Sequence, residues 1–165
     1  MKRLILLSLS VLALAACQSE PQVQRSQTPS FYVSMADAGA QVDAAMARDM
    51  ISAYRGNNGL AALTLDPELQ AAAQSEADAM ARADRPSSAE AFKGRLAATG
   101  YAAPAANLSA GYRTLAEAFS GWRESPPHNR VLLDARATRI GIATAYAPNS
   151  KYKVYWAFAV AADRR

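Results

Sequence analysis

The chain contains a single histidine, His128, so any acid–base step that requires an imidazole must use this residue. Ser88 or Ser125 could act as the nucleophile and Glu124 could orient the ring, because nucleophilic catalysis needs a nucleophile, a base and an orienting group. The alternative is that His128 lies in the first turn of a helix, where it packs and forms hydrogen bonds. We favour this alternative. The sequence also contains no glycine-rich phosphate loop, no paired catalytic carboxylates and no Cys/His cluster.

The chain also contains a single cysteine, Cys17, which therefore has no partner for a disulfide within the chain. Lys2 and Arg3 precede an apolar run over residues 4–14, and small residues follow this run. This order of charged, apolar and small residues is typical of a secretory signal. The sequence Leu14-Ala15-Ala16-Cys17 resembles the bacterial lipobox, in which the thiol receives a diacylglycerol and the cysteine becomes the new N-terminus.

The lipobox resemblance implies a signal peptide over residues 1–16 and an acylated, palmitate-bearing Cys17 that binds the membrane. One acyl chain binds only reversibly, at about 0.8 kcal/mol per buried methylene, so the several chains of a lipoprotein imply a stable anchor. Gln18 stands where an aspartate would favour retention in the inner membrane of many Gram-negative bacteria. We therefore expect an outer-membrane lipoprotein that faces the periplasm. The alternative is ordinary signal cleavage near Ala16, which would leave a free thiol.

Composition limits the class of partner. Removal of residues 1–16 leaves 16 basic and 14 acidic residues, a net charge of about +2, and the basic residues form no run. A nucleic-acid partner is therefore not expected. Residues 17–34 are rich in Gln, Ser and Pro and predict a flexible tether, which leaves one domain over residues 35–163. We expect this domain to be monomeric and to have no cofactor.

Local signals place several helices. A first helix is expected over residues 37–54, with a buried stripe formed by Val42, Ala45, Met46, Asp49, Met50 and Ala53. A second helix is expected after Asp66, a good N-cap residue that is followed by Pro67. The capping-box spacing of Ser87 with Glu90 predicts a third helix. Thr114 with Glu117 predicts a fourth in the same way, and Ser125-Pro126-Pro127 predicts a short helix that begins just before His128.

The C-terminal part of the chain has the pattern of strands. Residues 140–146 are rich in β-formers and residues 152–160 alternate large and small side chains, so a hairpin with its turn at residues 147–151 is expected. Residues 102–111 are expected to form a loop or a short strand. Helices followed by a terminal hairpin predict an α+β fold.

Trp122 is followed by Ser125-Pro126-Pro127-His128, then by Ile140-Gly141, and finally by the aromatic pair Tyr155-Trp156. Earlier stretches add to this pattern: Ile51 to Arg55 with Gly59-Leu60 and Leu63, Leu69 with Ala72-Ala73 and Met80-Ala81, Arg95-Leu96 with Gly100-Tyr101, and Asn107 to Tyr112. In this order and spacing, residues 40–160 resemble the CAP superfamily of cysteine-rich secretory, antigen 5 and pathogenesis-related proteins. The resemblance implies an α-β-α sandwich of CAP type with a central antiparallel sheet.

The cavity of this family often carries two histidines and two glutamates that bind a divalent metal, as the chemistry of zinc requires. Only His128 matches. The other histidine position falls near Ser88, one glutamate position is Ala106, and the other is Ser125, with Glu124 one residue earlier. A single histidine, with no cysteine left after acylation, does not form a conventional zinc site, so no metal is expected.

The resemblance implies a groove, for which the expected lining residues are His128, Asn107, Ser88, Glu124, Tyr101 and Tyr112. A structural role is the alternative for Asn107, and a solvated charge is the alternative for Glu124. The expected function is a non-enzymatic module that binds an envelope lipid, peptide or cell-wall fragment. Two other hypotheses remain: a metal-independent hydrolase that uses His128 with a serine, and a structural lipoprotein that contacts another envelope protein through a large apolar patch.

Overall fold

The structure is a computed structural model that describes residues 28–164, so the expected signal peptide and Cys17 lie outside the described residues. Its elements, in chain order, are η1 (Ser30–Tyr32), α1 (Ala44–Asn57), β1 (Thr64–Leu65), α2 (Pro67–Ala83), α3 (Ala89–Ala98), β2 (Tyr101–Ala110), α4 (Leu115–Glu124), α5 (Pro126–Leu132), β3 (Arg139–Tyr146) and β4 (Val154–Arg164). None of the helices within residues 28–164 has the length and apolar character needed to cross a membrane.

The four strands form one sheet in the order β1-β3-β4-β2. β3 and β4 pair antiparallel, which confirms the predicted hairpin, and Phe158 of β4 lies opposite Ile142 on one side and Asn107 of β2 on the other. Residues 102–111, expected as a loop or short strand, belong mostly to the ten-residue edge strand β2. This strand is rich in alanine and contains Pro104, so its pairing with β4 overrides a weak local preference for the strand conformation.

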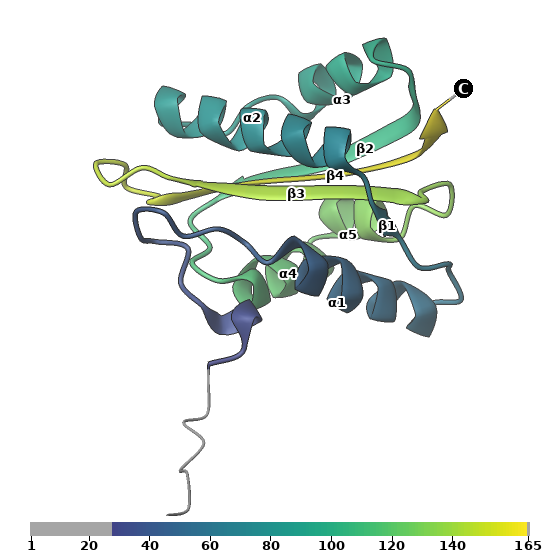
Figure 1. Ribbon diagram of the computed structural model, residues 1–165, viewed down its shortest axis with the longest axis horizontal. Helices are drawn as coiled ribbons and strands as arrows, with labels where there is room; N and C mark the ends of the chain where they lie inside the picture. Colours follow the sequence, from purple (N-terminus) through teal and green to yellow (C-terminus); the bar gives the residue numbers. More distant parts are fainter. Residues whose placement is uncertain (1–27, 165) are drawn as a thin grey trace, which may run out of the picture.

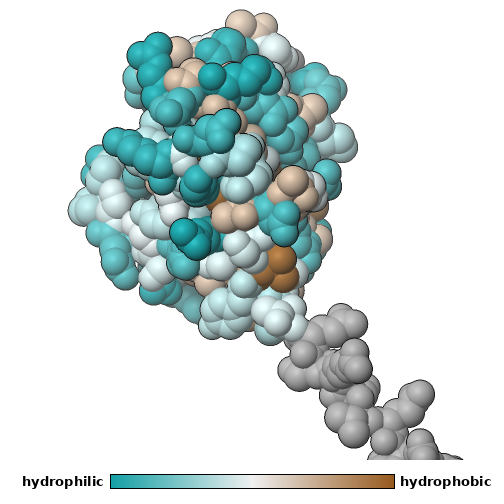
Figure 2. Space-filling view, turned by 90° about the vertical axis from the view of Figure 1, so that its left-hand side faces the viewer, coloured by the Kyte–Doolittle hydropathy of each residue, from teal (hydrophilic) through white to brown (hydrophobic). Residues whose placement is uncertain are grey.

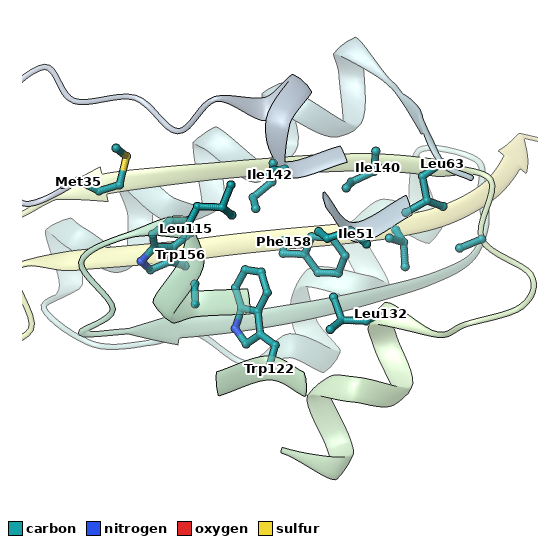
Figure 3. Packing of buried hydrophobic residues seen from close by; sticks show 14 of the residues in the cluster. Met35, Ile51, Leu63, Leu115, Trp122, Leu132, Ile140, Ile142, Trp156 and Phe158 are labelled. Atoms are coloured by element: carbon teal, nitrogen blue, oxygen red, sulfur yellow. The ribbon is translucent and has the colours of Figure 1, made fainter. Parts of the chain in front are cut away.

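Helices cover both faces of the sheet, α2 and α3 on one side and α1, α4 and α5 on the other (Figure 1). This arrangement confirms the α+β class and the α-β-α sandwich. The side chains of β4 alternate between the two layers. Trp156 and Phe158 pack with Trp122 of α4 in the larger core (Figure 3), whereas Ala157 and Ala159 belong to the clusters beneath α2 and α3.

The layer that contains α2 is packed very closely against β3. A Cβ atom at Gly141 would lie 2.4 Å from the backbone carbonyl carbon of Leu69. Ala73 and Ala77 of the same helix are fully buried. The small residues on α2 therefore permit close approach of the helix to the sheet.

Two details of the predicted helices were wrong. α1 begins at Ala44 rather than near residue 37, because the Asp43 side chain caps it by accepting a hydrogen bond of 2.9 Å from Met46 N. Its fully buried residues are Ala47, Ile51 and Arg55, which the expected stripe did not include. Of the expected stripe, Val42, Met46 and Met50 are half-buried against the core, while Ala45, Asp49 and Ala53 are exposed.

The helix caps were predicted with one error. Asp66 caps α2 and Thr114 caps α4, as expected. α3, however, is capped by Ser88, whose hydroxyl oxygen accepts a hydrogen bond of 3.3 Å from Ala91 N. Ser87 lies one residue before the cap, because the helix starts one residue later than the Ser87–Glu90 spacing predicted.

Candidate functional site

A groove opens where the start of α3, the middle of β2 and the helix α5 meet. It is a cavity of about 440 Å³, and we call it the His128 groove. Its lining residues are Ser87, Ala89, Glu90, Lys93, Ala105, Ala106, Asn107, Leu108, Pro127, His128, Arg130, Val131 and Asp134. The groove therefore lies along the free edge of the sheet, because β2 is the outermost strand on this side.

His128 and Asn107 are directly connected. His128 lies in the first turn of α5, which starts with two prolines that favour the initial helical turn. Asn107 is completely buried on β2, and its Nδ2 donates a hydrogen bond of 3.1 Å to the backbone oxygen of His128. The edge strand thus holds the start of the helix that carries the histidine.

Both residues also have a buried polar atom without a partner. His128 Nδ1 and Asn107 Oδ1 form no hydrogen bond with any of the residues that the structure describes. Burial lowers the pKa of the His128 ring below its ordinary value of 6.5, so the ring is neutral at pH 7. Unpaired buried polar atoms destabilise a protein, and native sites that retain them require an explanation such as a ligand or a bound water molecule.

The charged residues of the groove are partly paired with one another. Lys93 forms an ion pair of 2.5 Å with Glu90, and Asp134 forms one of 2.7 Å with Arg136. Arg130 is exposed and forms no ion pair with a residue of the described range. The groove therefore presents one guanidinium that is available for an anionic group.

The structure does not bring the proposed nucleophiles and the orienting carboxylate to His128. The Ser88 hydroxyl caps α3, and Ser125 is the residue between α4 and α5. Glu124 is exposed at the end of α4, where it accepts a hydrogen bond of 3.3 Å from Ser120. None of these three side chains lines the His128 groove, and none of them forms a hydrogen bond with the His128 ring in the part of the chain that the structure describes.

The two tyrosines also lie elsewhere. Tyr101 is buried at the start of β2 and donates a hydrogen bond of 2.6 Å to Asp66 Oδ1, in a different pocket. Tyr112 packs against α4, where a Cβ atom at Gly121 would lie 2.1 Å from its hydroxyl oxygen. Of the six residues expected to line the groove, only His128 and Asn107 do so.

The residues of the groove do not fit a divalent metal. His128 is the only nitrogen donor of an imidazole, and the position next to Asn107 is Ala106. The carboxylates of Glu90 and Asp134 are paired with basic side chains. Within residues 28–164, no three His, Cys, Asp or Glu side chains converge in a way that could hold a metal ion.

Arg55 is one buried residue that sequence analysis missed. It is completely buried, and its guanidinium donates four hydrogen bonds of 2.9 to 3.1 Å to backbone oxygens. The acceptors are the carbonyl oxygens of Ala61, Leu132, Asp134 and Ala137. Arg55 therefore fixes the end of α5 and the segment after it, behind the groove. Its spacing of four residues from Ile51, and of eight from Ala47, was the available signal.

Comparisons with known proteins agree with this fold. The family model of the cysteine-rich secretory protein family (CAP) matches residues 48–160. Similar solved structures include an extracellular protein with an SCP domain from Bacillus anthracis str. Ames, with a TM-score of 0.60 and 16% identity over 73% of this chain and 40% of that chain. A cysteine-rich secretory protein from Staphylococcus aureus subsp. aureus Mu50 has a TM-score of 0.60 and 16% identity over 72% of this chain and 38% of that chain. The chain thus spans about 40% of the length of these two proteins.

An outer surface protein from Borrelia burgdorferi is also similar, with a TM-score of 0.61 and 15% identity over 78% of this chain and 100% of that chain. At these identities the solved structures show a shared fold. No curated protein sequence matches the chain. Because the family model matches more than half of the chain, the protein belongs to the cysteine-rich secretory protein (CAP) family.

Proposed function

We propose that this CAP-domain protein is a lipid-anchored binding module whose His128 groove takes an envelope ligand: a lipid, a peptide or a cell-wall fragment. One observation carries the proposal. The groove wall contains two buried polar atoms, His128 Nδ1 and Asn107 Oδ1, that have no partner among the described residues. A ligand with a hydroxyl or amide group would supply the missing hydrogen bonds and offset the cost of burying these atoms.

The geometry supports binding rather than hydrolysis. A hydrolase would need a nucleophile within hydrogen-bond reach of His128, about 2.6 to 3.2 Å. Ser88 is instead used as a helix cap, and Ser125 does not line the groove. The neutral His128 ring and the Asn107 amide are suited to hydrogen bonding with an uncharged polar group, while Arg130 is suited to an anionic one.

The surface gives less support to a role as a structural contact protein. Tyr32, with 59% of its surface exposed, and Val33, with 43%, are the exposed large apolar residues of the range 28–164. Figure 2 shows a face on which hydrophilic side chains predominate and apolar ones are scattered. A protein-contact patch would be a contiguous apolar area of several hundred Å².

The proposed location is the bacterial envelope, with the acylated Cys17 in the outer membrane and the domain in the periplasm. The lipobox-like sequence before Cys17 supports the anchor, and Gln18 supports the outer membrane. The names of two similar proteins, one extracellular and one an outer surface protein, support a location outside the cytoplasm.

Native mass spectrometry tests the binding role. The full-length chain would be produced with its export signal, purified in mild detergent and weighed under native and denaturing conditions. A difference that corresponds to a lipid, peptide or glycan supports the proposal. A difference of one zinc ion would contradict it and favour a metal-dependent enzyme, and a bare mass after gentle extraction would favour a role without a groove ligand.

A further inference from the structure

A second pocket lies on the other side of α3, and it shares no lining residue with the His128 groove. It is a cavity of about 230 Å³ between α2, α3, the start of β2 and the end of β4, and we call it the Glu76 pocket. Its lining residues are Glu68, Ala72, Ser75, Glu76, Phe92, Arg95, Leu96, Thr99, Tyr101 and Arg164.

Glu76 is the unusual residue of this pocket. Only 4% of its surface is exposed, although it carries a carboxylate on a helix that otherwise buries alanine, leucine and methionine. Its Oε2 pairs with the guanidinium of Arg95. Its Oε1 is buried and receives no hydrogen bond from the residues of the described range. A buried carboxylate oxygen of this kind needs a donor, and the strongest donor for it is a cation.

Two arginines stand beside this carboxylate, each next to an aromatic ring. The Arg95 side chain is 58% exposed, and its guanidinium carbon lies 5.5 Å from the centre of the Phe92 ring. Arg164 pairs with Glu68, and its guanidinium carbon lies 4.6 Å from the centre of the Tyr101 ring. Because both guanidinium groups are partly exposed, either can reorient toward an incoming anion.

The charges of the pocket balance. Two guanidinium groups oppose two carboxylates, so a ligand with only a negative charge would face Glu76 and Glu68, and a ligand with only a positive charge would face both arginines. A ligand that carries both charges at a short separation satisfies both sides. The apolar side chains of Phe92 and Leu96 complete the wall.

We propose that the Glu76 pocket binds the zwitterionic head of an amino acid, with a free amine and a free carboxylate on one carbon. The ammonium group donates to Glu76 Oε1, the carboxylate accepts from Arg95 or Arg164, and a small side chain lies against Phe92. The cavity is smaller than the roughly 300 to 1,000 Å³ of pockets for drug-sized ligands, which suits a group of this size. A free amino acid shares this chemistry with a diamino-acid residue of an envelope peptide, whose side chain ends in a free amine and a free carboxylate on one carbon.

An NMR titration of the full-length chain in mild detergent tests the proposal. The amide signals of Phe92, Leu96 and Tyr101 would be followed as D-alanine or L-alanine is added, and ethylamine and propionate would be used as the two half-ligands. We expect saturable shifts with alanine and at least tenfold weaker binding of each half-ligand. A soluble cell-wall stem peptide that carries a free amine and carboxylate on one carbon distinguishes the two sources: tighter binding than alanine indicates the envelope peptide, and weaker binding indicates the free amino acid.

Two variants and a control make the test specific. Glu76→Gln removes the charge of the ammonium site at nearly constant size, and Arg95→Met removes an exposed guanidinium, so each is expected to weaken alanine binding at least tenfold. Asp78→Asn changes a carboxylate on the same helix that does not line the pocket and is expected to leave binding unchanged. The proposal is overturned if alanine produces no saturable shifts in the pocket, if a half-ligand binds as well as alanine, or if both variants bind as wild type.

Discussion

Asn107 on the edge strand β2 donates its side-chain amide to the backbone oxygen of His128, 3.1 Å away, and so joins the sheet to the first turn of α5. The remaining polar atom of each side chain, Asn107 Oδ1 and His128 Nδ1, is left buried without a partner in the described chain. The contact therefore connects the sheet to the helix, and in the proposed function the two unpaired atoms form hydrogen bonds with the ligand.

Replacement of Asn107 by alanine is expected to lower the free energy of unfolding by about 1 to 3 kcal/mol, because the variant loses a buried hydrogen bond and leaves the His128 carbonyl without its donor. Urea unfolding followed by circular dichroism measures this change. Asn149→Ala, in the exposed turn between β3 and β4, is the matched control and should change the free energy of unfolding by less than about 0.5 kcal/mol. An equal effect of the two variants would mean that the contact to His128 has no structural role.

Gly141→Ala is expected to destabilise the protein by about 1 to 3 kcal/mol or more, because the new Cβ atom would lie 2.4 Å from the backbone of Leu69 and would push α2 away from the sheet. The same substitution at Gly94, in the middle of α3, meets no atom within 4 Å and is expected to stabilise the protein by up to about 1 kcal/mol through helix propensity. The difference in melting temperature between the two variants checks the close packing of α2. If both variants shifted the melting temperature in the same direction, the close packing of α2 against the sheet would be contradicted.

The fold was predictable where local signals are strong, and the site was less predictable. Asp66 and Thr114 were identified as helix caps because capping depends on neighbouring residues. The strand β2 was underestimated because its alanines have little strand preference, and only pairing with β4 makes them extended. Arg55 was overlooked because its role depends on four carbonyl groups from distant parts of the chain.

The residues of the His128 groove were likewise predictable only in part. His128 and Asn107, which both line the groove, belong to segments that carry the family resemblance. Ser88 and Tyr101 lie outside the groove because a helix cap and a hydrogen bond to Asp66 hold them elsewhere. Such competing local contacts become visible only when all the elements are positioned. Glu76 was missed because it is charged, although its spacing of three residues from Ala73 and four from Met80 puts it on the buried face of α2.

The free energy of unfolding is expected to decrease as the pH falls below 6.5, the ordinary pKa of a histidine ring. Burial lowers the pKa of His128 in the folded state, so the unfolded chain binds a proton more readily, and protonation favours unfolding. The neutral ring contributes its full stabilisation at pH values above the pKa of His128 in the unfolded chain. This contribution disappears as the pH falls through the lower pKa that His128 has in the folded protein. Urea unfolding measures the free energy of unfolding near pH 7.5 and pH 5.5. Between these two pH values it should decrease more for wild type than for His128→Gln. Equal losses would place the ring in solvent.

Cys17→Ser is expected to abolish incorporation of radioactive palmitate and to release the protein from the membrane fraction, because the serine hydroxyl does not replace the thiol as the lipid acceptor. Ser19→Ala, two residues away, is the matched control and should remain labelled and membrane-bound. In a Gram-negative host, Gln18→Asp should move the protein to the inner membrane. Palmitate labelling that persists in Cys17→Ser would place the lipid on another residue.

The mass of ligand that remains bound when a large side chain fills the His128 groove tests the proposed binding role. Val131 lines the groove, whereas Leu133, at the end of the same helix, does not. Native mass spectrometry would compare the wild-type chain with Val131→Trp and Leu133→Trp, after unfolding measurements have shown that both variants are folded. We expect a lipid, peptide or glycan mass on wild type and Leu133→Trp that is lost in Val131→Trp. Retention of the same mass in Val131→Trp would show that the ligand binds elsewhere and would contradict the proposed function.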